Sequence, residues 1–590
     1  MSAASGTHAA DVSGGFAAPG GPPGLPSSEA WGPCPTPAVP AGHLSKAATL
    51  IGAATAVSRM LGFGRVLVIA AVLGTTDLGN TFSASNSVSN VLFDLLAAGA
   101  LSAVLVPAFV ELLDQRRALR SEEPAPGGLG GVPPTTAAGA AKECEELAGA
   151  LLGWSLVVLG PVCLAGVVAA PALARLLTTG TADPVVAAGQ RHLATFLLRL
   201  FIPQVLLYAV GAVTTAVLHA KRRFTVTAVA PIGNTVMMVL ALGAFRVLHG
   251  PGPAGFDLSL AERLALGAAG TLGVAAFVVI PALSLRRTDF RLRIRVPRPA
   301  AVRGLGRTVR LSAWAGVQHA GTAVLLASAL LVGMGVSGGV VAYQVAFAFF
   351  LVPYAVLALP LITAVLPELA GEAGRGDRVA FGRSLRWALD GMVVFVVPVS
   401  VAGVVFAPRL MEALHLGQTS AEGGRLIGVA LAALAAGLLP YGAFLLFVRA
   451  HYALGEGRAP AVAAVGSAGL GAVLMAVGGA LAHGDAKLAV MGAAHSAAYL
   501  TGALVLGVSL ARRTGRPLAP ARLGRTLWVS IALGVGCAAI LHWVDPVGRT
   551  ATLGLVSVLA AASAAVYLAA LAPRRGGLST VLAVRGYPPR

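Results

Sequence analysis

Residues 338–367 read GGVVAYQVAFAFFLVPYAVLALPLITAVLP and contain no charged side chain. An α-helix rises about 1.5 Å per residue, so roughly 20 apolar residues are enough to cross the hydrocarbon core of a bilayer. Apolar stretches of similar length fill nearly all of the chain from about residue 47 onward. The fourteen predicted spans are 47–73, 82–113, 147–176, 190–219, 224–248, 259–285, 308–335, 338–367, 385–407, 422–449, 459–483, 487–511, 526–544 and 550–572.

The composition agrees with a membrane protein. Of the 590 residues, 56% are hydrophobic and 11% are charged, whereas a soluble domain carries about 25% charged residues. We therefore predict an all-α polytopic membrane protein with about 14 transmembrane helices. Only a tight turn, Gly335–Gly339, separates the seventh span from the eighth. If those two were one span, the count would be thirteen and the C-terminus would lie outside.

The basic residues are concentrated on alternate loops. If the N-terminus is cytoplasmic, 32 of the 43 Lys and Arg residues fall on inside segments, six fall on outside segments and five fall within spans. This asymmetry follows the positive-inside rule and predicts that both termini are cytoplasmic. The net charge of +19 is spread over these loops, which favours contact with anionic membrane lipids over a nucleic-acid groove. The loop from Arg286 to Arg310 carries nine arginines and is the densest basic segment.

Several other classes of function lack their sequence signals. None of the four lysines follows a glycine, so the chain has no phosphate-binding loop of an ATPase. The four cysteines have no metal-like spacing, and we predict no metal or cofactor. Residues 1–45 are rich in Gly, Pro, Ala and Ser without an apolar run of signal-peptide length, which predicts a disordered cytoplasmic tail. Any transport would draw on the membrane potential or a monovalent cation gradient.

Ionisable residues inside the predicted spans are the main candidates for function, because a charge in the bilayer costs several kcal/mol unless it meets water or a partner. Arg59 and Arg65 lie in the first span, and a planar guanidinium is suited to binding phosphate. Gly62 and Gly64 between them are candidate hinges that would let both arginines face one cavity. The alternative is that Arg65 reaches the membrane surface while Arg59 pairs with a buried acid, for which Asp94 is the obvious candidate.

The run SRMLGFGR at residues 58–65 resembles the first-helix signature of the MurJ/MviN family of lipid II flippases in the MOP exporter superfamily. Further segments resemble the family in the same order along the chain. They are Asn80–Phe109 with Ser89 and Asn90, Arg223–Asn234, Tyr343–Pro367 and Arg449–Leu454.

The resemblance implies two six-helix lobes around a central cavity, with two C-terminal helices that add a groove for a lipid tail. It implies that a bacterial plasma-membrane protein carries a polyprenyl-diphosphate-linked cell-wall precursor, lipid II, from the inner to the outer leaflet. Arg59 and Arg65 would hold the diphosphate, and Asn80, Asn90 and Asp94 would line the same site. The implied divisions are a tail (1–45), an N-lobe (46–285), a basic loop (286–307), a C-lobe (308–511), helices 13 and 14 (512–573) and a C-terminal tail (574–590).

The chain departs from the family pattern at several positions. Asn80 replaces a frequent acidic residue, with Asp77 nearby, and Ser89 replaces a proline. Phe93 and the Phe347–Ala348 pair stand where some members carry arginines. Three alternatives therefore remain: a divergent paralogue that moves another lipid-linked glycan, a multidrug antiporter, and a non-transporting scaffold that binds cell-wall synthesis proteins. The few acidic residues in the spans argue against the antiporter.

Overall fold

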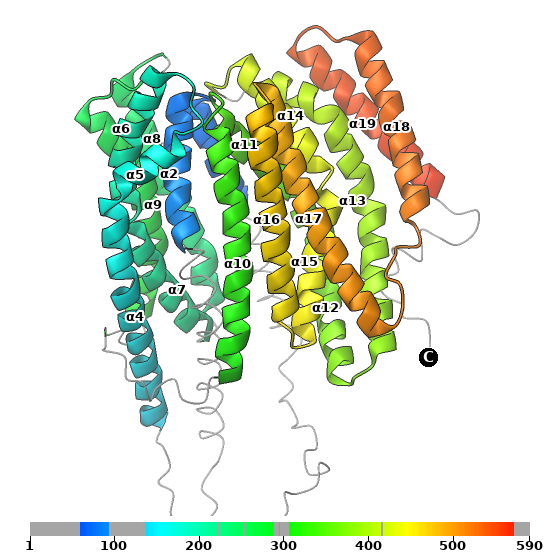
Figure 1. Cartoon of the computed structure of the whole chain (residues 1–590), viewed down its shortest axis with the longest axis horizontal. Helices are drawn as coiled ribbons and strands as arrows, with labels where there is room; N and C mark the ends of the chain where they lie inside the picture. Colours follow the sequence, from blue (N-terminus) through cyan, green and yellow to red (C-terminus); the bar gives the residue numbers. More distant parts are fainter. Residues whose placement is uncertain are drawn as a thin grey trace, which may run out of the picture. The chain divides into compact units, whose positions relative to one another are not determined.

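The computed structural model describes residues 60–93, 137–220, 223–252, 254–287, 294, 306–414 and 417–571. Both predicted tails, most of the predicted basic loop, and the candidate residues Arg59 and Asp94 lie outside these ranges. The described residues form helices joined by short turns (Figure 1).

A helix from Met60 to Leu73 comes first. The next elements are α2 (Asp77–Phe93), α4 (Ala137–Val168), α5 (Ala170–Leu177), α6 (Pro184–Phe201), α7 (Gln204–Ala220), α8 (Phe224–His249) and α9 (Leu260–Arg286). They are followed by α10 (Gly306–Gly333), α11 (Gly339–Pro353), the π-helix η4 (Tyr354–Ala358), α12 (Leu359–Gly374), α13 (Arg378–Leu414), α14 (Ala421–Ala435) and α15 (Leu438–Ala453). The last are α16 (Arg458–Leu481), α17 (Asp485–Thr514), α18 (Leu523–Val544) and α19 (Arg549–Leu571).

Helices occupy the described parts of the predicted spans. In the described part of the chain, 11 helices are long and apolar enough to cross a membrane, and the bent pair α14–α15 makes up to 12. The first two predicted spans fall on the helix Met60–Leu73 and on α2, each of which adjoins residues outside the described ranges. The seventh and eighth predicted spans are separate helices, because α10 ends at Gly333 and α11 begins at Gly339.

Four predicted spans are interrupted rather than formed by one regular α-helix. The third divides into α4 and α5 at Ala169, and the fourth divides into α6 and α7 just before and after Pro203. The eighth contains η4, which begins after Pro353, and the tenth bends by 51° between α14 and α15. Proline lacks an amide hydrogen and clashes with the preceding turn, which explains the interruptions at Pro203 and Pro353. Outside the spans, α4 begins at Ala137, ten residues before the predicted start at residue 147.

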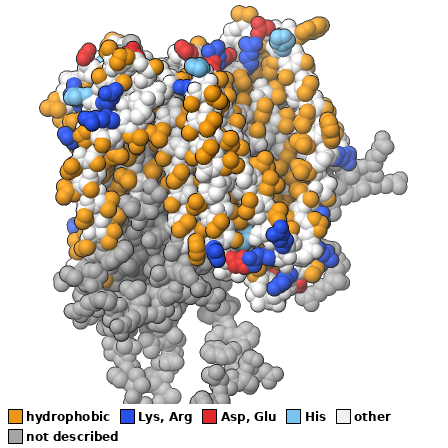
Figure 2. Space-filling model, viewed as in Figure 1, with side chains coloured by type: hydrophobic (Ala, Val, Ile, Leu, Met, Phe, Trp, Pro, Cys, Tyr) orange, Lys and Arg blue, Asp and Glu red, His pale blue; other side chains and the backbone are white. Residues whose placement is uncertain are grey.

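The helices pack around separate hydrophobic clusters. We call the helix Met60–Leu73, α2 and α4–α9 the N-terminal group, and α10–α17 the C-terminal group. Two buried clusters lie mainly in the N-terminal group and the largest lies in the C-terminal group. A fourth joins α18 and α19 to α13. Figure 2 shows hydrophobic side chains over most of the visible helix surface, with charged side chains gathered toward the helix ends, as a bilayer requires.

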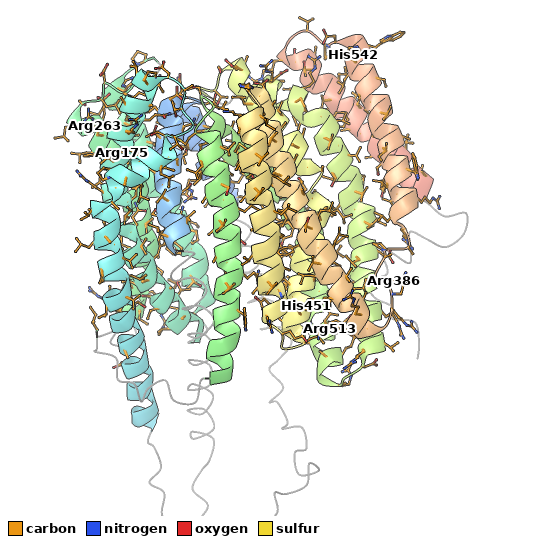
Figure 3. All side chains as sticks on the ribbon, viewed as in Figure 1. Arg175, Arg263, Arg386, His451, Arg513 and His542 are labelled. Carbon is orange, nitrogen blue, oxygen red and sulfur yellow. The ribbon has the colours of Figure 1, made fainter. Side chains whose placement is uncertain are left out.

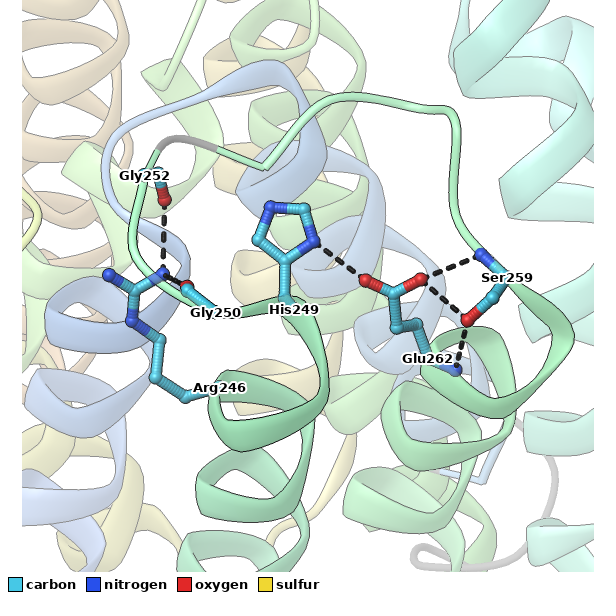
Figure 4. Close-up of polar contacts among 6 residues, drawn as sticks. All are labelled: Arg246, His249, Gly250, Gly252, Ser259 and Glu262. Atoms are coloured by element: carbon cyan, nitrogen blue, oxygen red, sulfur yellow. Dashed lines mark hydrogen bonds and ion pairs between the residues drawn. The ribbon is translucent and has the colours of Figure 1, made fainter.

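In the connection from α8 to α9, side chains form hydrogen bonds at the end of α8 and at the start of α9. His249 Nδ1 lies 2.7 Å from Glu262 Oε1, and Ser259 and Glu262 form a capping box at the start of α9 (Figure 4). Arg246 donates to the carbonyl oxygens of Gly250 and Gly252 at 2.6 and 3.0 Å. These contacts hold the ends of two neighbouring helices together.

Candidate functional site

The first described helix, Met60–Leu73, is part of the N-terminal group and also packs against the C-terminal group. Its Ile69 and Leu73 belong to a cluster of the N-terminal group, whereas Ala70 belongs to the cluster of the C-terminal group. The Phe63 ring packs edge-on against Phe349 of α11, with 4.9 Å between ring centroids. The backbone of the helix also contacts the start of α14, because the Gln418 amide donates to Ala71 O at 3.0 Å. This helix therefore contacts both groups.

Arg65 is the predicted phosphate ligand that the structure describes. Its side chain is half-buried, and its Nε atom is buried without a hydrogen-bond partner among the described residues. A Cβ at Gly62 or at Gly64 would meet no atom of the described residues within 4 Å. The helix continues through both glycines without a break, and their role as hinges stays a prediction. Arg65 thus has a buried donor without a partner among the described residues, and a guanidinium suits a ligand with anionic oxygens.

Asn80 is fully buried and joins the two groups. Its Nδ2 donates to Val336 O at 2.7 Å, and its Oδ1 accepts from the amides of Val340 and Val341 at 2.9 and 3.4 Å. The residue before α11 is Gly338, which has no side chain to cap that helix. Asn80 therefore supplies from α2 the oxygen that an N-cap residue would normally provide.

Asp77 lies beside Asn80 in a second set of contacts. Ser337 Oγ donates to Asp77 Oδ2 at 3.1 Å, and Gln190 Nε2 donates to Asp77 Oδ1 at 3.4 Å. Thr181 Oγ1 donates to Gln190 Oε1 at 2.8 Å, which links the start of α6 to this set. Burial raises the pKa of Asp77, the Ser337 hydroxyl lowers it and the charge of Asp183 raises it, with a net increase from 3.8. We call Asp77, Asn80, Gln190, Ser337 and the start of α11 the interlobe contact.

Further along α2, Asn90 and Ser87 face different partners. Tyr208 of α7 donates to Asn90 Oδ1 at 2.9 Å, which keeps Asn90 within the N-terminal group. Gln344 of α11 donates to Ser87 Oγ at 3.0 Å and connects the two groups. Three predicted substrate-binding residues lie in the described ranges. The side chains of Asn80 and Asn90 form hydrogen bonds within the protein, whereas Arg65 Nε has no hydrogen-bond partner among the described residues.

A separate cavity of about 350 Å³ lies between α13, α18 and α19. Its lining is almost entirely apolar and includes Val394, Pro398, Gly534, Ala564 and Leu568. Tyr567 also lines it and donates to Val394 O at 2.6 Å, so its polar group is satisfied. The predicted groove for a lipid tail is compatible with this place and this lining.

Sequence reasoning missed the contacts that hold the two groups together. Gln190 was not singled out, although a fully buried glutamine next to an acid is informative once the fold is known. Other span-end arginines lie apart from this contact. Arg175 and Arg263 lie on the N-terminal group, and Arg386 and Arg513 lie near the far end of the C-terminal group (Figure 3).

Two solved structures share the fold. A structure described as "Lipid II flippase MurJ, inward closed conformation" has a TM-score of 0.64 at 15% identity, covering 88% of this chain and 99% of that chain. An inward-facing multidrug resistance MATE family transporter of the MOP superfamily has a TM-score of 0.59 at 14% identity, covering 78% and 94%. The chain is therefore an all-helical polytopic membrane protein with the fold of these two structures.

The sequence comparisons identify the family. A family model described as "Lipid II flippase MurJ" matches residues 69–560. A "Probable lipid II flippase MurJ" of Rhizobium tropici is 25% identical over 390 residues, 66% of this chain and 67% of the relative. A "Lipid II flippase MurJ" of Burkholderia cenocepacia is 24% identical over 432 residues, 72% and 76%. The chain belongs to the MurJ lipid II flippase family, as a divergent member.

Proposed function

We propose that this protein translocates lipid II, a polyprenyl-diphosphate-linked cell-wall precursor, from the inner to the outer leaflet for peptidoglycan assembly. The proposal rests on the family match over residues 69–560. The observation that carries the site is Arg65, whose Nε is buried and has no hydrogen-bond partner among the described residues. Arg59 completes the phosphate site in this proposal, with both termini in the cytoplasm.

The interlobe contact supports a transport cycle of alternating access. Under the proposed orientation, this contact closes the outer end of the space between the two groups. Opening it requires breaking hydrogen bonds that a few polar side chains make, together with the packing of Leu330, Met334 and Val340 against the N-terminal group. Moving one charge through the membrane potential is worth about 2.3 kcal/mol per 100 mV, so a potential or a cation gradient is sufficient to bias such a cycle.

The first test is complementation of a bacterium depleted of its own flippase. We expect the full chain to restore growth, and Arg65→Ala to lower lipid II flipping in proteoliposomes by roughly tenfold or more, because charge-assisted hydrogen bonds are lost. Arg65→Lys should fall between them, since it keeps the charge without the planar fork. Arg175→Ala is the matched control, an exposed arginine of the same helix group.

The outcomes separate the alternatives. Drug resistance without rescue would support an antiporter, and retained partner binding without either would support a scaffold. Transport of another polyprenyl-linked glycan in place of lipid II would support a divergent paralogue. If Arg59→Ala and Arg65→Ala are expressed normally and flip lipid II at the unsubstituted rate, the proposed phosphate site is wrong.

A further inference from the structure

A histidine and a tyrosine face each other inside the C-terminal group. Tyr343 of α11 and His495 of α17 are almost fully buried, with exposed fractions of 3% and 5%. Their Oη and Nδ1 atoms are 2.6 Å apart, which is a short hydrogen bond. The second ring nitrogen, His495 Nε2, is buried and has no hydrogen-bond partner among the described residues.

That unpaired nitrogen distinguishes His495 from a structural histidine. Whichever tautomer is present, His495 has a buried donor or acceptor unsatisfied, and buried polar groups in native proteins are normally paired. His451, the other buried histidine of the C-terminal group, shows the usual pattern. Its Nδ1 lies 2.9 Å from Phe447 O, and its Nε2 lies 3.0 Å from Ser509 Oγ.

Aromatic rings surround His495. The rings of Phe347 and Tyr499 lie 5.3 and 4.9 Å from it, and Tyr441 packs against Tyr499 at 4.7 Å. Ring faces at such distances attract a cation. Besides the tyrosines Tyr343, Tyr441, Tyr452 and Tyr499, the described charged and titratable side chains on the elements packed against α17 are His319, Arg378, Arg383, Arg386, Asp390, Arg409, Glu412, Glu422, Arg425, Arg449, His451 and Arg458, with Asp485, Lys487, Arg512 and Arg513 on α17 itself. No hydrogen bond or ion pair in the described part joins any of these non-tyrosine side chains to His495.

We propose that His495 is a proton-binding site of the C-terminal group and that Tyr343 is its hydrogen-bonding partner. A proton from the aqueous phase adds to the free lone pair of the imidazole, and no other bond breaks. The imidazolium then has two N–H donors, and Tyr343 Oη accepts from Nδ1. The Nε2–H donor needs a second acceptor, which no described residue offers in this conformation. Proton binding therefore favours a different arrangement of α11 against α17.

The position of Tyr343 connects this site to the interlobe contact. Asn80 holds the amides of Val340 and Val341 at the start of α11, and Tyr343 follows Val340 by three residues, a rise of about 4.5 Å. A shift of α11 that gives the imidazolium a new partner also moves the amides that Asn80 caps. Protonation of His495 should therefore open the interlobe contact. This consequence rests on the proposed transport cycle, whereas proton binding itself does not.

The test measures the interlobe distance against pH in the full-length chain without lipid substrate. Spin labels at Val185→Cys on α6 and Ala421→Cys on α14, with the four native cysteines replaced by alanine, report this distance in nanodiscs. We expect the distance distribution to shift toward the open population as the pH is lowered from about 8 to about 4, a range that starts above and extends below that of an exposed histidine. His495→Gln should abolish this opening, and Tyr343→Phe, which keeps the ring, should move its midpoint to lower pH.

Two control variants show whether the pH response of the interlobe distance comes from His495. His451→Gln should keep the unsubstituted pH response, because that histidine already has both nitrogens paired. Asp77→Asn should keep the part of the pH response of the interlobe distance that depends on His495. The proposal is overturned by a distance that does not respond to pH, by an unchanged response in His495→Gln, or by an Asp77→Asn variant that alone abolishes it. Failure of Arg65 variants to affect flipping, with this response intact, would overturn only the proposed phosphate site.

Discussion

At the residue scale, Asn80 and Asp77 show how two side chains control the contact between helix groups. Asn80 satisfies two amides and one carbonyl of a segment more than 250 positions away in the chain. Asp77 accepts from Ser337 and Gln190 in the same place. Because both side chains are at the start of α2, any rotation of that helix breaks both sets of bonds together.

Asn80→Ala should weaken the closed interlobe contact. Loss of a helix cap is worth on the order of 1 kcal/mol, or roughly fivefold in an equilibrium constant, and Val336 O also loses its donor. The spin-label distance described above should shift toward the open population. Thr81→Ala is the control, because the Thr81 hydroxyl donates only to Asp77 O within α2. An equal shift in both variants would contradict the capping role.

Ionisation of Asp77 should weaken the closed interlobe contact as the pH rises. Its folded-state pKa is raised from 3.8, so the stability that the protonated form provides is fully present below about 3.8 and is lost as pH rises through the raised pKa. Asp77→Asn should hold the closed population constant over that window. The measurement is the same distance distribution taken through the acidic range, with His495→Gln in the background to remove the histidine response. A variant that titrates as before would contradict this role.

At the element scale, helix ends and breaks are where the groups meet. Thr76 caps α2 by accepting from the Gly79 amide at 3.1 Å, and Gly74, with φ 67°, ends the helix before it. The turn before α11 ends at Gly338, with φ 72°. An ideal Cβ at Gly338 would lie 2.4 Å from Thr75 O. This turn therefore requires glycine for its backbone conformation and for the close approach of the first helix pair.

Gly338→Ala should be more disruptive than Gly515→Ala. Both glycines are in the left-handed conformation, with φ 72° and 68°, which costs a residue with a Cβ about 1–2 kcal/mol. Of the two, only Gly338 faces another backbone, since a Cβ at Gly515 meets no described atom within 4 Å. Thermal unfolding in detergent should therefore show a larger loss for Gly338→Ala, and the spin-label distance should widen in that variant alone. Equal losses would mean that the contact with Thr75 relaxes freely.

At the scale of the whole molecule, α18 and α19 attach to α13 of the C-terminal group through a small apolar cluster, the hydrogen bond from Tyr567 to Val394 O and the ion pair of Arg409 with Asp545. The apolar cavity of about 350 Å³ lies at this junction. An apolar hollow beside a loosely packed helix pair can accept a hydrocarbon chain at little energetic cost, because no packed core must open. The cavity is therefore our candidate for the tail of the lipid substrate.

Ala564→Phe should fill part of that cavity and slow lipid II flipping severalfold while the protein still folds. Ala564 is an exposed lining residue, so the larger ring has room without disturbing a core. Ala562→Phe is the matched control, because it lies two residues, or about 200° around the helix, from Ala564. Flipping in proteoliposomes and thermal unfolding measure the two effects. Equal flipping by both variants would exclude the cavity from the lipid path.

The sequence by itself determined the membrane class, the order of the helices and the family. Charge-free stretches of twenty or more residues must be helical in a bilayer, because each amide needs a partner within its own segment. The length of the apolar stretch from 308 to 367 predicted two spans divided at the glycine-rich turn, and α10 and α11 are separate helices. The presence of arginine in the first span drew attention to Arg65, since charges within a bilayer are rare.

Only the tertiary structure decided which polar side chains meet. Asn80 caps α11, Asp77 meets Ser337, and His495 meets Tyr343, and each pair is separated by more than 150 positions in the chain. Nothing in their local sequence encodes these partners, because an amide, a carboxylate or an imidazole can bond to many groups. Packing of the apolar helix faces brings them together, and burial then makes each pairing matter.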